Sequence, residues 1–211
     1  KKTLKSASSD TGVVSGAFIE TAGQTTCLAA GSERLKTGSL AVGRLFRYST
    51  KLVVSGEQTI KEGLGAQLLD VTREGASVYA VGRSMAVTKH TTTPLWRWMF
   101  VKWDAELKKE QWRTVHPLAG NFGLRSITIN DGQPKPALYA CGRLDQLNGK
   151  TVPMLVRADV ATGKITASWT GTAMKGGYFR HIYFNSTLSG LFAVGWIPNA
   201  KHVTVGLAAR F

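Results

Sequence analysis

Four copies of one short motif constrain the fold of this chain more than any other feature. Each copy is a hydrophobic residue, then Leu, Tyr or Phe, then Ala, a small apolar residue and Gly, and the copies occupy residues 27–31 (CLAAG), 78–82 (VYAVG), 138–142 (LYACG) and 191–195 (LFAVG). Their glycines lie 51, 60 and 53 residues apart. A repeat of about this length is typical of chains built from equivalent structural units that pack side by side.

The residues around each motif alternate between apolar and polar and stop at Gly, Asp, Asn or Pro, which predicts strands joined by hairpins. The predicted strands are 13–20, 25–31, 38–45 and 51–56; 65–72, 77–83, 97–103 and 110–115; 123–129, 137–143, 152–158 and 164–169; and 178–184, 190–196 and 203–210. A long loop is expected at 85–94 in the second unit. The last unit offers three strands where the others offer four.

Four-stranded units of about 50 residues predict an all-β fold, a β-propeller of about four antiparallel blades. The expected units are 13–62, 63–120, 121–175 and 176–211, preceded by a basic tail or closing strand at 1–12. A β-sandwich would show no long repeat and a β-trefoil would show three units, so both folds agree less well with the four repeats in this sequence. The missing last strand is expected from residues 1–12 or from another chain, and membership of a larger ring stays open.

Two stretches carry a resemblance to known repeats. Residues 139–143 (YACGR), 155–159 (LVRAD) and Thr162-Gly163 form one copy, and residues 79–83 with 101–104 form a second. This pattern resembles propeller repeats of bacterial and protist surface proteins. It is also similar to kelch repeats, through Tyr79 with Trp112 and Tyr139 with Trp169, although the paired glycines of kelch are absent. The resemblance implies the fold alone, and no functional residues come with it.

The charge is strongly unbalanced. Lys and Arg number 27 against 13 Asp and Glu, a formal net charge of +14, and no carboxylate side chain follows Asp159. Such an excess favours encounter with polyanions such as nucleic acid, acidic polysaccharide or an acidic protein, although it also serves solubility alone. Lys175, Arg180 and Lys201 in the cationic last unit are candidate contacts.

No apolar run is long enough to span a membrane, and a chain that begins with Lys suggests that a segment was removed upstream.

Strand ends supply a further candidate surface. Arg44, Arg83 and Arg143 each follow a glycine near a strand end, and Trp196 follows Gly195. Equivalent strand ends of a propeller emerge on one rim, so these side chains predict a ring suited to an anion or a glycan. The competing interpretation is that the arginines bridge neighbouring units through carbonyl groups. The stretch 96–103 (WRWMFVKW) is either an interior strand, apolar on both faces, or an exposed platform on which sugars or bases stack.

The sequence offers no catalytic, cofactor or metal site. Its four histidines stand singly, without the spacing of metal ligands. Cys27 and Cys141 are expected to be separate buried thiols. The carboxylates Asp70, Asp104, Asp145 and Asp159 are expected mainly as turn caps. Residues 185–187 (NST) make Asn185 a candidate glycosylation site in the hairpin between the first two strands of the last unit.

These observations predict a non-enzymatic propeller that serves as a binding or assembly module. Its expected role is that of a structural subunit of an extracellular or surface assembly that contacts partner proteins or acidic glycans. One alternative is a basic, RNA-associated subunit of an organellar ribonucleoprotein, with Lys175, Arg180 and Lys201 among the contacts. Another is a propeller enzyme acting on acidic polysaccharide, in which a carboxylate or His181 supplies acid and base chemistry.

Overall fold

The protein consists of strands and their connections. The computed structural model describes residues 10–21, 24–34, 41–49, 51, 53–88, 91–116, 122–130, 136–145, 151–171, 176–188, 190–198 and 204–211. The strands are β1 (Asp10–Thr21), β2 (Gln24–Arg34), β3 (Ala41–Tyr48), β4 (Val54–Ile60), β5 (Gly65–Glu74), β6 (Ser77–Thr88), β7 (Thr91–Asp104), β8 (Glu110–Val115), β9 (Phe122–Asn130), β10 (Ala137–Asp145), β11 (Thr151–Asp159), β12 (Ile165–Thr170), β13 (Tyr178–Asn185), β14 (Gly190–Pro198) and β15 (Thr204–Arg210).

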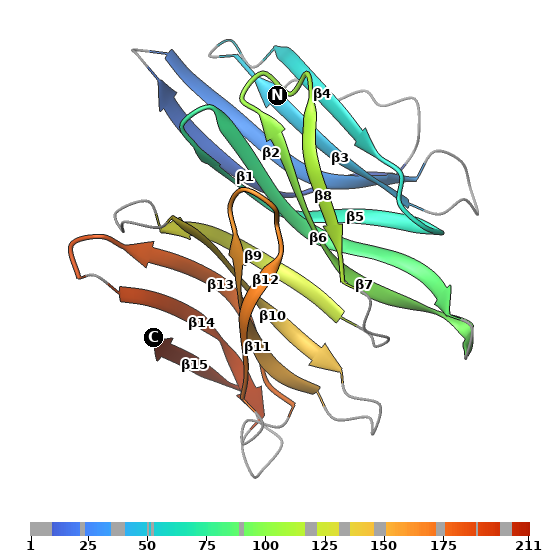
Figure 1. Cartoon of the computed structure of the whole chain (residues 1–211), viewed down its shortest axis with the longest axis vertical. Helices are drawn as coiled ribbons and strands as arrows, with labels where there is room; N and C mark the ends of the chain where they lie inside the picture. The colour runs from blue at the N-terminus through green and yellow to red at the C-terminus, as the bar shows by residue number, and fades with distance from the viewer. Residues whose placement is uncertain are drawn as a thin grey trace.

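These strands form four antiparallel sheets in chain order, as the sequence predicted. Three sheets have four strands, β1 to β4, β5 to β8 and β9 to β12, and the fourth sheet has three, β13 to β15. Figure 1 shows the sheets as successive blades, from the blue first sheet through green and orange to the red fourth sheet. The fold is therefore propeller-like and all-β, and the described strands do not close into a barrel.

One predicted loop is wrong. Residues 85–94 were expected to form a loop, but β6 continues to Thr88 and β7 begins at Thr91, with Met85 opposite Trp96. The described residues of this segment extend the paired strands β6 and β7. The threonines and the short apolar residues of this segment match a strand, and Pro94 lies near the end of the hairpin, where a proline is tolerated.

Successive sheets pack face to face because each second strand is apolar on both sides. In β6, Val78 and Ala80 belong to the core between the first and second sheets, and Tyr79 and Val81 belong to the core between the second and third. A third core lies between the third and fourth sheets and includes Cys141. Burial of apolar side chains on both faces of the middle sheets is the main stabilising term.

The described strands pack as a series and not as a closed ring. The first strands of neighbouring sheets, β1 with β5, β5 with β9 and β9 with β13, lie against each other, and no comparable packing joins the described parts of the fourth and first sheets. The tail expected at 1–12 lies partly outside the described residues. Its described part, from Asp10, pairs with β2 and so extends the first sheet.

Each repeated glycine faces a β-bulge in the first strand of its own sheet. Gly82 pairs with Leu68 and the next pair begins at Asp70, so Leu69 is left without a partner. The equivalent unpaired residues are Val14, Arg125 and Arg180, opposite Gly31, Gly142 and Gly195. A Cβ atom at Gly82, Gly142 or Gly195 would lie within 1.9, 1.9 or 2.0 Å of a carbonyl oxygen of that first strand. The motif ends in glycine because the bulged backbone fills the space of a side chain.

Candidate anion-binding site

Three of the predicted rim residues occupy equivalent positions in consecutive sheets. Each directly follows a bulge-facing glycine in the second strand of its sheet: Arg83 lies opposite Gln67, Arg143 opposite Gly123, and Trp196 opposite Tyr178. The corresponding residue of the first sheet is Ser32, opposite Gly12. The rim therefore carries its charged and aromatic residues on the second, third and fourth sheets. Arg83 was predicted at a strand end but lies inside β6, because that strand continues to Thr88.

The bulges bring two more arginines to this rim. Arg125 and Arg180 are the unpaired bulge residues of β9 and β13, so their side chains emerge next to the strand ends that carry Arg143 and Trp196. Arg180 was a candidate because of its charge, whereas Arg125 was missed. A comparison of the first strands with one another would have found it, because residues 68–70 (LLD), 124–126 (LRS) and 179–181 (FRH) align.

The four arginines are close enough to influence one another. Burial lowers the pKa of Arg83, and the charges of Arg125 and Arg143 lower it further. Burial also lowers the pKa of Arg125, and the charge of Arg180 lowers it further, against an opposing effect of Tyr178 that exceeds the lowering by Arg143. We call Arg83, Arg125, Arg143 and Arg180 the arginine cluster. Within the described part of the chain, no carboxylate forms an ion pair with Arg83, Arg125 or Arg180.

Aromatic side chains and one amide contact two members of the cluster, Arg83 and Arg125. The guanidinium carbon of Arg83 lies 4.2 Å from the ring centroid of Trp96, and its Nε donates a hydrogen bond of 2.8 Å to Gln67 Oε1. The Arg125 guanidinium lies 6.0 Å from the Tyr178 ring, which meets Trp196 edge-on at 4.2 Å. Stacking on rings orients a guanidinium without using up its outward hydrogen-bond donors.

The Arg83 side chain also bridges two sheets. Its Cδ lies 4.0 Å from the position that a Cβ would take at Gly123 in β9, so the chain from β6 runs over the first strand of the third sheet. This contact places the Arg83 charge next to the start of β9. The sequence-based alternative was that arginines bridge neighbouring units through carbonyl groups. The aliphatic part of Arg83 does reach the third sheet, but its Nε donates to Gln67 of its own sheet.

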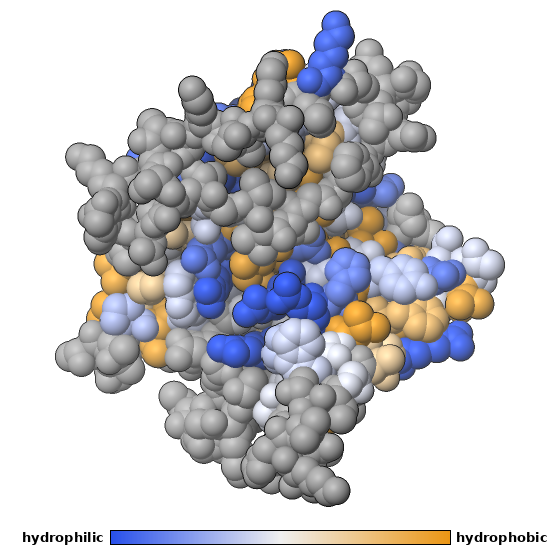
Figure 2. Space-filling view, turned by 180° about the vertical axis from the view of Figure 1, so that it is seen from behind, coloured by the Kyte–Doolittle hydropathy of each residue, from blue (hydrophilic) through white to orange (hydrophobic). Residues whose placement is uncertain are grey.

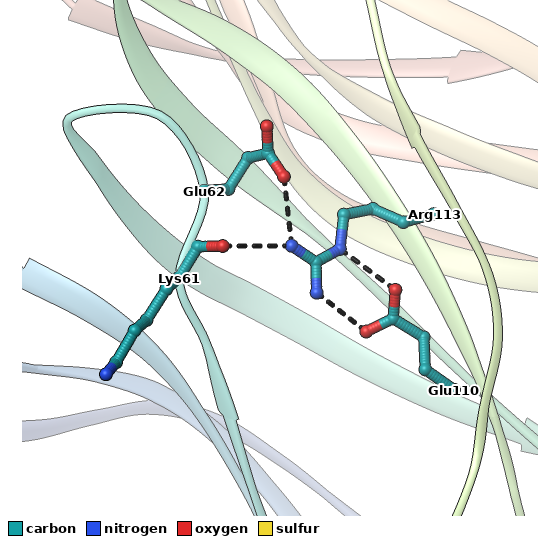
Figure 3. A network of polar contacts seen from close by, with 4 residues as sticks. All are labelled: Lys61, Glu62, Glu110 and Arg113. Carbon is teal, nitrogen blue, oxygen red and sulfur yellow. Dashed lines mark hydrogen bonds and ion pairs between the residues drawn. The ribbon is translucent and has the colours of Figure 1, made fainter.

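Three other described arginines, Arg44, Arg47 and Arg113, form ion pairs with carboxylates. Arg113 of β8 donates to both oxygens of Glu110, at 3.0 and 2.7 Å, and to Glu62 Oε2 at 2.9 Å (Figure 3). It also donates to the Lys61 carbonyl at 3.0 Å. Although burial opposes the effect, the hydrogen bonds from Glu110 and Glu62 raise the pKa of Arg113. Its environment is thus opposite in character to that of the arginine cluster.

Arg44 is one of the arginines paired with carboxylates, and it does not lie on the rim. It lies in β3, opposite Gly31, where its Nε lies 3.1 Å from Glu33 Oε2 and its other nitrogens contact Glu57 and Thr59. The glycine that precedes Arg44 is Gly43, which is not one of the repeated glycines. The prediction failed because one Gly-Arg pair stands in a third strand and the others stand in second strands.

Two predicted cationic contacts, Lys175 and Lys201, lie outside the described residues. Arg180 is exposed. Figure 2, the view from the opposite side to Figure 1, shows hydrophilic side chains gathered across the middle of one face, with apolar ones beside them.

Asn185 ends β13 at the hairpin, as predicted, and its amide nitrogen donates to the Tyr183 hydroxyl at 3.3 Å while its oxygen accepts from Leu188 N at 2.9 Å.

Asp70, Ser126 and His181 form a polar chain across three sheets, each directly after the bulge of its strand. Ser126 Oγ donates to Asp70 Oδ2 at 2.7 Å and lies 3.0 Å from His181 Nδ1. Since the single hydroxyl proton goes to Asp70, the imidazole donates at Nδ1. Ile127 N donates to Asp70 Oδ2 at 2.9 Å, and Ile182 N donates to Ser126 Oγ at 3.3 Å.

This chain ties adjacent sheets together and lacks the order of a catalytic triad. In a triad the serine donates to histidine, which the carboxylate orients. Here the serine donates to the carboxylate, and Ser126 is 1% exposed. The sequence predicted turn caps at the aspartates, and this is confirmed for Asp104 and for Asp159, whose carboxylates accept backbone N–H groups of their turns. It is wrong for Asp70, and the Asp145 side chain is not among the described ones.

The remaining candidates take structural positions. Trp98 and Phe100 pack toward the third sheet and Met99, Val101 and Trp103 toward the first, which confirms the prediction of an interior strand for this stretch. Cys27 and Cys141 are both free, as expected, but only Cys141 is buried and Cys27 is partly exposed. Burial, followed by the charge of Asp70, raises the pKa of the Cys141 thiol. In the described ranges, no three His, Cys, Asp or Glu side chains are grouped to hold a metal ion. Nor do these ranges hold a helix able to cross a membrane.

Comparison with known proteins gives little guidance. No family model matches the chain, and no curated protein matches its sequence. Among solved structures, the chain is similar to one described as a glucose dehydrogenase, with a TM-score of 0.34 and 10% identity over 81% of this chain and 73% of that one. A similarity of this size carries no argument about fold or function.

Proposed function

We propose that this protein is a non-enzymatic propeller module that binds acidic glycan chains at the arginine cluster and serves in an extracellular or surface assembly. The observation that carries the proposal is the convergence of four arginines from three consecutive sheets onto one rim, with no described carboxylate paired with Arg83, Arg125 or Arg180. Concentrating like charges costs stability, and a bound anion removes that cost.

The chemistry of the rim favours glycans among the possible polyanions. Guanidinium groups bind carboxylates and sulfates through two parallel hydrogen bonds. Trp96, Tyr178 and Trp196 place aromatic rings beside these groups, and such rings pack against the apolar faces of sugars. An acidic polysaccharide presents both kinds of group at short intervals, so one chain can contact several arginines and rings at once.

The test is a titration with a fluorescently labelled heparin octasaccharide, followed by anisotropy. We expect the wild type to bind and the double variant Arg125→Gln/Arg180→Gln to bind at least tenfold more weakly, since two charge-assisted contacts are lost. The matched control is Arg157→Gln/Arg73→Gln, which removes the same charge from β11 and β5 outside the cluster. Its affinity should change less than threefold.

The outcomes separate specific binding from general attraction. Equal weakening by both double variants would mean that the net charge alone binds the glycan, and the proposal would be wrong. Binding of a single-stranded RNA of equal charge more tightly than the octasaccharide, with the same dependence on Arg125 and Arg180, would replace the glycan by RNA as the ligand.

A further inference from the structure

His181 lies on the face of β13 that carries one of the aromatic rings of the rim. Phe179 and Ile182 of this strand belong to the third core. Tyr178 and His181, on either side of the bulge, therefore lie on the opposite face. Tyr178 pairs with Trp196, and His181 pairs with the residue two positions before Trp196 in β14. Positions two residues apart in a strand are separated by about 7 Å, so the imidazole neighbours the two aromatic rings.

Two successive residues of β9 contact this face of β13, which lies against β9 (Figure 1). The guanidinium of Arg125 lies 6.0 Å from the Tyr178 ring. The next residue, Ser126, places its Oγ 3.0 Å from Nδ1 of His181. Arg180 directly precedes His181 in the chain, and its charge acts on Arg125. His181 is therefore flanked by two members of the arginine cluster, one from each strand.

The hydrogen bonds of Ser126 determine which nitrogen of His181 takes up a proton. The Ser126 hydroxyl donates its single proton to Asp70, so Nδ1 of His181 donates to Ser126 Oγ. The neutral ring then carries its lone pair on Nε2. His181 is exposed, whereas Ser126 is 1% exposed. Protonation at Nε2 keeps the bond to Ser126 and adds a positive charge and an N–H donor on the side of the ring away from it.

The groups around His181 carry charges of both signs. The carboxylate of Asp70, behind Ser126, favours a charged imidazole, whereas Arg125 and Arg180 oppose it. The sequence of β14 contains no titratable residue. The other titratable residues of β13 and of the strands packed against it are Tyr139, Cys141, Arg143, Asp145, Arg157, Asp159, Tyr178 and Tyr183. A polyanion bound to the arginine cluster offsets the repulsion by the arginines and so favours the protonated ring.

We infer that His181 is a fifth anion-binding residue of this site, and that its charged form strengthens the binding of acidic glycans in mildly acidic solution. The inference rests on the proposed function, because the bound polyanion supplies the charge that favours the proton. Histidine side chains ordinarily titrate at about pH 6.5. As the pH falls through this range, one charge-assisted contact is added and more counterions are released on binding.

The test is the titration of the full chain with the labelled heparin octasaccharide at about pH 8 and about pH 5.5, for the wild type, His181→Gln and His181→Lys. Glutamine keeps a donor for Ser126 Oγ but takes up no proton, and lysine is charged at both pH values. Between these pH values the affinity of the wild type should rise roughly fivefold more than that of His181→Gln. His181→Lys should bind more tightly than the wild type at the higher pH and should respond to pH no more than His181→Gln.

Two further readouts separate binding by His181 from a structural role. Calorimetry in buffers of different ionisation enthalpy measures the protons taken up on binding, and His181→Gln should take up fewer than the wild type at about pH 6.5. The salt slope of the binding constant at about pH 5.5 should be smaller by about one in His181→Gln, because one contact is lost. A structural role would weaken binding equally at both pH values and leave the proton uptake unchanged.

Failure of this inference is distinguishable from failure of the proposed function. An identical pH response and proton uptake in the wild type and His181→Gln would overturn the inference, even if Arg125→Gln/Arg180→Gln weakens binding as proposed. If that double variant binds as tightly as the wild type, the proposed function is wrong and the role of His181 is wrong with it. Melting temperatures at both pH values check that the variants are folded, and His181→Asn takes the place of His181→Gln if the glutamine variant is destabilised.

Discussion

At the scale of single residues, the repeated glycines are explained by the backbone that faces them. Opposite Gly82, Gly142 and Gly195, the bulge in the first strand brings a carbonyl oxygen to where a side chain would start, so the requirement is for space and not for an unusual backbone angle. The sequence revealed the four glycines but not this cause, because a bulge in one strand leaves no local signature in another. For the same reason Arg125, a bulge residue, escaped prediction.

Gly142→Ala should lower the free energy of unfolding by about 3 kcal/mol or more, because the new methyl group meets the Gly123 carbonyl oxygen. Urea denaturation followed by tryptophan fluorescence measures this. The control is Gly206→Ala, where the added Cβ meets nothing, and it should change stability by less than about 0.5 kcal/mol. Equal effects of the two changes would contradict the account of the motif.

His116 should make stability depend on pH near neutrality. It stacks on Trp98 with centroids 4.3 Å apart, and burial lowers its pKa. The unfolded chain therefore binds a proton at this group more readily, so stability is full above its ordinary pKa of about 6.5 and falls as the pH drops below that value. When the buffer is changed from about pH 7.5 to about pH 5.5, the urea midpoint of unfolding should fall less in His116→Gln than in the wild type. An identical loss in the variant would assign the pH dependence to other groups.

At the scale of elements, the units are held together by two kinds of contact. Apolar cores lie between the sheets, and the Asp70 and Ser126 side chains accept backbone N–H groups from the first strand of the next sheet. Strand positions were predictable because alternation and turn residues are local signals. The polar chain was not, since it joins residues about 56 positions apart whose meeting depends on the packing of whole sheets.

Ser126→Ala should destabilise the protein by about 1–3 kcal/mol, because it leaves a buried carboxylate oxygen of Asp70 with fewer donors and the Ile182 N–H without its acceptor. Thermal and urea unfolding give the magnitude. Ser168→Ala, on the exposed face of β12, is the matched control and should be nearly neutral. If the two substitutions cost the same, the polar chain contributes nothing to the joining of the sheets.

At the scale of the whole molecule, the number and order of the sheets followed from the repeat, and so did the three strands described in the fourth sheet. The sequence also predicted equivalent positions for Arg83, Arg143 and Trp196, which the strand registers confirm, although Arg83 lies inside β6 and not at a strand end. It misplaced Arg44, whose neighbouring glutamates come from other strands. A charge count cannot separate an arginine that is paired with a carboxylate from one that is not. That distinction needs the fold.

The most direct test of the arginine cluster as an anion site is the salt dependence of its affinity for the heparin octasaccharide. Counterion release makes the logarithm of the binding constant fall linearly with the logarithm of the salt concentration, and each lost contact reduces the slope by about one. Arg125→Gln/Arg180→Gln should reduce the slope by about two, and Arg157→Gln/Arg73→Gln should leave it unchanged. Equal slopes for the wild type and both double variants would contradict the account, because the arginine cluster would then make no more contacts with the glycan than other surface arginines do.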